Sequence, residues 1–205
     1  MTSSDRYPAT LLSVFAVLWA LLAIRPWYRQ DWLLENVLVF IAVPLFVATY
    51  RSLRFSNFAY TCLFLFFALH EVGAHYTYSE VPWRAWLESA GLPLGEPTGR
   101  NHYDRFVHFS YGLLMFPATW ELFAARARPE RVWRWLMPVM FLMGHSVIYE
   151  LVEWLAAAVF GGDLGAAYLG TQGDDWDAQK DMALASAGAV VGLLITVTLR
   201  RPLRS

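Results

Sequence analysis

One stretch of the sequence decides the fold class: residues 57–75 read NFAYTCLFLFFALHEVGAH. A helix needs about 20 mostly apolar residues to cross the hydrocarbon core of a bilayer, and this stretch has that length and character. Its acidic and imidazole side chains occur only near one end, at His70, Glu71 and His75. The stretch therefore predicts a membrane-spanning helix whose polar groups gather toward one surface of the membrane.

The composition of the whole chain supports a membrane protein. The chain has 205 residues, of which 57% are hydrophobic and 16% charged, whereas a typical soluble domain has about 25% charged residues. This excludes an ordinary cytosolic enzyme, a nucleic-acid-binding protein and a disordered linker. The net charge of −1 implies no strongly acidic or basic partner, and the single cysteine, Cys62, cannot form an intramolecular disulfide.

The same length criterion predicts one all-α domain over residues 1–205, a polytopic transmembrane helix bundle with about six spans. The first span is interpreted as a retained helix, because the segment before it carries only Arg6 and no small-x-small cleavage site follows it. The predicted spans are residues 8–24, 32–50, 57–75, 103–124, 132–160 and 181–199.

The basic residues predict the orientation of these spans. With six spans, the side that holds both termini carries ten of the sixteen Lys and Arg residues. Cytoplasmic loops carry an excess of basic residues, so both termini are expected in the cytoplasm. This orientation assumes a multi-pass protein of the bacterial inner (cytoplasmic) membrane, which is the localisation we expect.

The acidic residues show the opposite asymmetry. Under this topology, fourteen of the seventeen lie at or beyond the outer ends of the spans, and only Asp5, Glu121 and Glu130 do not. Several of the fourteen lie inside apolar stretches, where an ionisable side chain is costly and commonly functional. The acids therefore point to a polar pocket in the outer leaflet.

Asp104 and His108 begin the fourth predicted span and, being four residues apart, share one helix face. Such a pair can bind a cation jointly, or the carboxylate can orient the imidazole as a general base. The alternative is structural, because an acid at a helix N-terminus is favoured by the helix dipole and His108 would only bond to it.

Glu150 and Glu153 lie one turn apart in the fifth predicted span, within an apolar stretch. An ionised group at membrane depth costs at least about 2.5 kcal/mol. Two adjacent carboxylates also repel each other, so that either one is protonated or a cation lies between them. The alternative interpretation is a pair of acids that reach the membrane interface.

The sixth predicted span follows the segment GTQGDDWDAQKDM, residues 170–182, which has the composition of a turn leading into a helix. Asp177 and Asp181 share a helix face there. The residue pattern of an EF-hand is absent, and Asp174 and Asp175 are compatible with a solvated loop.

The third and fifth predicted spans run outward and carry their polar groups toward their ends, whereas the fourth and sixth run inward and carry them at their starts. All four sets are therefore expected in the outer third of the membrane. Oxygen and nitrogen donors without a thiolate suit Zn, Mn, Fe, Mg or Ca, and the sequence predicts one divalent metal among them. The candidate metal ligands are Asp104, His108, Glu150, Asp177, Asp181 and His70.

Over nearly the whole chain, these motifs resemble the YjdF-like family of bacterial inner-membrane proteins, which contain a domain of unknown function. The residues that carry the resemblance are His70-Glu71-x-Gly73, Asn101-x-Tyr103-Asp104-Arg105-x-x-His108-Phe109-x-x-Gly112, Glu150-x-x-Glu153-Trp154 and Gly170-Thr171-Gln172-Gly173-Asp174-x-Trp176-Asp177-x-x-x-Asp181-Met182.

The C-terminal half is more distantly similar to the VanZ-like family, a resemblance that implies low-level resistance to glycopeptide antibiotics. Arg105, Glu153 and Ala185 stand where that family has Lys, Gln and Asn. Neither resemblance implies a particular reaction. The positions that match the VanZ-like pattern are Asp104, His108, Glu150, Asp177, Asp181 and Gly188.

Three functional hypotheses follow from the residues. The first is a metal-assisted hydrolase or transferase acting on a lipid-linked substrate, with His108 beside the metal and Glu150 or Glu153 as general base. Arg105 would meet a phosphate or another anion of that substrate. The others are a cation or proton transporter and a non-enzymatic structural or partner-binding protein. The sequence leaves open whether the protein is an enzyme, which substrate it uses and its oligomeric state.

Overall fold

A computed structural model describes residues 3–92, 99–162, 165 and 169–199, and in these residues it contains helices and no strand. The all-α fold class is therefore confirmed. Among the elements that can be described with bounds, there are six long helices and a short one, α4 (Trp83–Ser89). The long helices cover the six predicted spans, with ends that differ by a few residues. The long helices are α1 (Ser3–Leu22), α2 (Arg29–Thr49), α3 (Asn57–His75), α5 (Tyr103–Arg126), α6 (Trp133–Phe160) and α8 (Asp177–Leu199).

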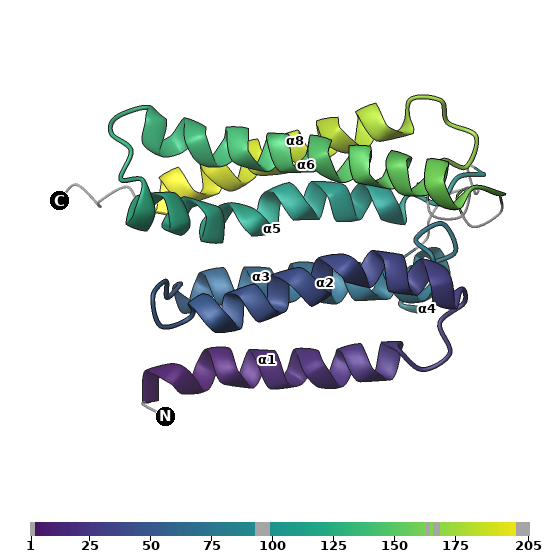
Figure 1. The fold of residues 1–205 in the computed structure, drawn as a ribbon, viewed down its shortest axis with the longest axis horizontal. Helices are drawn as coiled ribbons and strands as arrows, with labels where there is room; N and C mark the ends of the chain where they lie inside the picture. The colour runs from purple at the N-terminus through teal and green to yellow at the C-terminus, as the bar shows by residue number, and fades with distance from the viewer. Residues whose placement is uncertain (1–2, 93–98, 163–164, 166–168, 200–205) are drawn as a thin grey trace.

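Five of the long helices are apolar enough to cross a membrane: α1, α2, α3, α6 and α8. Large apolar side chains on their outer surfaces are exposed, such as Val17, Ile41 and Val159, as expected of helices surrounded by lipid rather than water. Helix α5 carries more polar side chains and lies parallel to the others in the bundle (Figure 1). The count of six spans and the orientation of the termini stay predictions.

The helices form a layered bundle with their axes roughly parallel (Figure 1). Helix α1 lies at one side and packs against α3, α3 packs against α5, and α5 contacts both α6 and α8. Buried aromatic and aliphatic side chains, including Phe15, Phe66, Phe67 and Val107, join α1, α3 and α5 in one core. The turn between α2 and α3 lies at the same end of the bundle as the N-terminus (Figure 1).

Helices α5 and α8 form the closest pair in the bundle, and glycines make this possible. A Cβ atom at Gly112 would collide with the backbone carbonyl oxygen of Ala185, and one at Gly188 would collide with that of Phe109. Small residues allow membrane helices to approach closely in this way. Because the two backbones touch, the first turns of α5 and α8 lie side by side, and their polar side chains meet.

Candidate functional site

The site is centred on three residues at the starts of α5 and α8. One ligand atom from each of Asp104, His108 and Asp181 lies within 4.8 Å of the others, a spacing that could hold a metal ion. His108 Nε2 lies 3.4 Å from Asp104 Oδ1, and the two residues share a face of α5 as the sequence predicts. Asp181 is buried, and its Oδ1 has no hydrogen-bond partner in the described part of the chain.

Helix α6 contributes the two glutamates to this site. Glu150 Oε1 lies 3.6 Å from His108 Nε2, so a fourth possible ligand reaches the group from a third helix. Glu153, one turn further along α6, lines the neighbouring cavity. We refer to Asp104, His108, Glu150 and Asp181 together as the carboxylate cluster.

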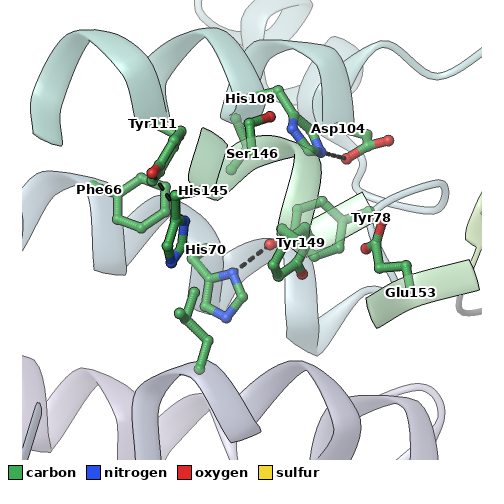
Figure 2. A pocket seen from close by; sticks show the side chains of 12 residues that line it. Phe66, His70, Tyr78, Asp104, His108, Tyr111, His145, Ser146, Tyr149 and Glu153 are labelled. Carbon is green, nitrogen blue, oxygen red and sulfur yellow. Dashed lines mark hydrogen bonds and ion pairs between the residues drawn. The ribbon is translucent and has the colours of Figure 1, made fainter. Parts of the chain in front are cut away.

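A cavity of about 40 Å³ lies beside the cluster. One water molecule needs about 10–15 Å³ of such volume, so the cavity holds about three water molecules. Figure 2 shows Tyr111, Phe66 and His145 on one side of it and Asp104, Tyr78 and Glu153 on the other. Its lining is mixed, with aromatic rings and donors of the oxygen and nitrogen type that hard and borderline metals prefer.

Arg105 and Asp177 lie next to the cluster, but they are engaged in a separate network. Arg105 pairs with Asp174 and lies 3.4 Å from Asp177, which also pairs with Arg100. Lys180 Nζ approaches Asp174 at 2.6 Å, and its hydrogen bond, with that of Arg105, holds the pKa of the Asp174 carboxyl well below its usual range. These residues therefore form an ionic cap over the first turns of α5 and α8.

His70 lies on the cavity wall formed by α3 and is not part of the group of three. Its Nδ1 lies 2.5 Å from the hydroxyl of Tyr78, and its Nε2 lies 3.2 Å from the backbone carbonyl oxygen of Glu35. The first of these contacts is drawn in Figure 2. Both ring nitrogens of His70 thus have protein partners, which fixes the orientation of the ring.

Three buried polar residues of α2 were not expected from the sequence. Glu35 accepts a hydrogen bond of 3.0 Å from Tyr149, which lines the cavity. Asp31 accepts one from Thr77, and Asn36 accepts one of 2.6 Å from Trp19. A signal was present, because Asp31 and Glu35 are four residues apart and Glu35 lies inside an apolar stretch.

Comparison with known proteins places this arrangement among membrane proteins. Residues 7–202 match a family model described as "Predicted membrane protein (DUF2238)". The chain is also similar to "Inner membrane protein YjdF" of Escherichia coli (strain K12), with 36% identity over 171 residues, which cover 81% of this chain and 77% of that protein. No solved structure matches the chain. The predicted localisation in the inner membrane, with several membrane helices, is confirmed.

Proposed function

This chain belongs to the DUF2238 family of predicted membrane proteins, and we propose that its carboxylate cluster binds a divalent metal ion for chemistry on a lipid-linked substrate. The reaction class is hydrolysis or group transfer. The observation that carries the proposal is the convergence of Asp104, His108 and Asp181 within 4.8 Å. Two carboxylates and one imidazole, with an open position beside them, match the donor set of catalytic divalent metals.

The unsatisfied oxygen of Asp181 supports a bound cation. A buried polar atom without a hydrogen bond costs roughly 1–3 kcal/mol, and Asp181 Oδ1 is such an atom in the described structure. Four ionisable groups around one point in a membrane protein also require compensation of their charge. A divalent ion would supply both the missing partner and the positive charge.

The remaining residues fit defined roles around such an ion. The ion would lower the pKa of a bound water and polarise the substrate. Glu153 lines the cavity beside the cluster, and we assign it the role of general base, with Glu150 as a ligand or second base. Arg105 would meet an anionic substrate group only by exchanging its ion pair with Asp174, so substrate binding would open the ionic cap.

The proposed topology gives the substrate class. With both termini in the cytoplasm, the first turns of α5 and α8 lie at the outer surface of the membrane, at the depth of lipid headgroups. A substrate carried on a lipid reaches this depth by diffusion within the bilayer, without a water-filled channel. The partners we expect are therefore a membrane lipid or lipid-linked substrate and no nucleic acid.

The metal content of the purified protein tests this proposal. We expect about one equivalent of Zn²⁺ or Mn²⁺ per chain after equilibration and desalting, measured by elemental analysis. The double variant Asp104→Asn with Asp181→Asn should fall to background. Asp175→Asn, an exposed aspartate in the same region, is the matched control and should keep the metal. Equal metal content in all three proteins, or none in the wild type, contradicts the proposal.

Cation or proton transport is the second candidate, favoured by Glu35. Tyr149, which lines the cavity, donates a hydrogen bond to Glu35. A second buried acid, Asp31, lies one turn before Glu35 in α2, and chains of acids are typical of proton pathways in membranes. Ion flux into proteoliposomes that disappears in Glu35→Gln would favour transport over the enzyme. No flux, together with stoichiometric metal binding, would favour the enzyme.

A further inference from the structure

A second and larger cavity lies in the other half of the bundle. Its volume is about 500 Å³, which is in the range of small-molecule binding sites. Helices α1 and α2 form its walls, and α3 forms its floor. It is separate from the carboxylate cluster, since the residues that line the two cavities do not overlap. The apolar part of its lining consists of Pro8, Ala9, Leu11, Leu12, Phe15, Val43, Phe46, Val47, Leu63, Phe64 and Phe67.

Polar groups line this cavity at one end only. Asp5 lies near the start of α1, Tyr50 and Arg51 follow the end of α2, and Tyr60 lies in the first turns of α3. The apolar part extends from there toward the middle of the helices, as far as Phe15 and Phe67 in the lining. A polar mouth and an apolar interior in one cavity match an amphiphile with a headgroup and a hydrocarbon chain.

The charge at the mouth selects the headgroup. Arg54 Nη1 pairs with Asp5 Oδ1 at 3.2 Å and lies over the ring of Tyr50. Arg51 is exposed at the mouth and has no ion pair among the described residues. The charges of Asp5 and Arg54 offset each other in their ion pair, and the guanidinium of Arg51 adds a positive charge to the lining. An anionic headgroup would therefore be attracted there.

We propose that this cavity is a binding site for an anionic phospholipid of the membrane. One acyl chain lies in the cavity between α1 and α2, and the phosphate meets the guanidinium of Arg51. The lipid comes from the leaflet at the end of the bundle where the N-terminus lies. This site is independent of the metal proposal, because it uses different helix ends and neither requires the other.

Native mass spectrometry of the full-length protein in detergent tests the site. The probes are phosphatidylglycerol and phosphatidylcholine with identical acyl chains, added in equal amounts. We expect the wild type to retain one lipid and to prefer phosphatidylglycerol about fivefold, the effect of one basic side chain near an anionic lipid. Equal retention of both lipids, or retention of neither, would overturn the proposal.

Two classes of variant separate the headgroup from the chain. Arg51→Gln should still retain one lipid, but it should bind phosphatidylglycerol and phosphatidylcholine about equally. Arg134→Gln, which removes an exposed arginine from the start of α6 outside the lining, should leave the preference unchanged. Ala9→Trp fills the cavity and should abolish retention. An equal effect of Arg51→Gln and Arg134→Gln overturns the proposal.

Leu12→Trp provides a second way to fill the cavity, from a half-exposed position on α1 that tolerates replacement better. It should also abolish retention, so the proposal stays testable if Ala9→Trp does not fold. Full lipid retention in a folded variant of either kind overturns the proposal. A wild-type dimer that either variant dissociates also overturns it, because a second copy of the chain would then occupy the cavity.

Discussion

The two halves of this bundle differ in how closely their helices pack, and the chemistry differs accordingly. At the α5–α8 pair, glycines bring two backbones into contact, and acidic and imidazole side chains from neighbouring turns meet within a few ångströms. Between α1 and α2, large side chains surround a cavity of about 500 Å³. Close packing concentrates polar groups into a site, whereas loose packing leaves room for a lipid.

The largest effect is expected from a bulky side chain at one of the glycines where α5 and α8 touch. We expect Gly112→Leu to lose at least about 3 kcal/mol of stability, because its side chain would overlap the backbone of α8 and overpacking alone costs about 1–3 kcal/mol. Thermal unfolding in detergent measures this loss. Gly144→Leu is the control, since nothing lies within 4 Å of a Cβ atom at Gly144. Equal melting of the two variants would contradict the close packing of α5 and α8.

Removing one partner of the ionic cap should have a smaller effect. Arg100→Gln leaves the buried Asp177 with weaker compensation, and we expect a loss of about 2 kcal/mol, as for other hydrogen bonds to charged groups. Arg84→Gln breaks a more exposed pair with Glu88 and should cost less than about 0.5 kcal/mol. Urea titration of both variants in the same detergent measures the difference. A loss of equal size would mean that the cap contributes no more than a surface pair.

The smallest effect concerns the pH dependence of the cap. Lys180 and Arg105 lower the pKa of Asp174 in the folded protein. The ionised Asp174 carboxylate therefore stabilises the folded state in full above its unfolded pKa of about 3.9. This contribution is lost as the pH falls through the lower pKa of the folded state. The difference in melting temperature between wild type and Asp174→Asn should therefore be constant from pH 8 to about pH 5 and should shrink below about pH 4. A difference that already declines near pH 6 would contradict this assignment.

Much of the fold could be predicted because membrane helices carry their own signal. An apolar stretch of about 20 residues predicts a helix without reference to its neighbours, and helix α3 covers the predicted range 57–75. The pairing of Asp104 with His108 was equally accessible, since residues four apart share a helix face. These are local properties of the chain.

The parts of the site that could not be predicted depend on which helices touch. The sequence does not indicate that Arg105 pairs with Asp174, or that Glu35 of α2 meets Tyr149 of α6. Glu35 is one of the fourteen acids at the outer ends of the spans, but only its contact with Tyr149 of α6 shows that it reaches the cavity. Contacts between helices depend on packing in three dimensions, which a pattern along one helix does not contain.

The closeness of α5 and α8 has a consequence for how the protein is made. In the described structure, α5 is the long helix that is not apolar enough to be recognised as a span, and its closest partner, α8, is synthesised after the whole of α6. Polar membrane helices are held in place by their neighbours rather than by their own transfer into lipid. Because Asp181 belongs to α8, the site can form only after α8 has been synthesised and has packed against α5.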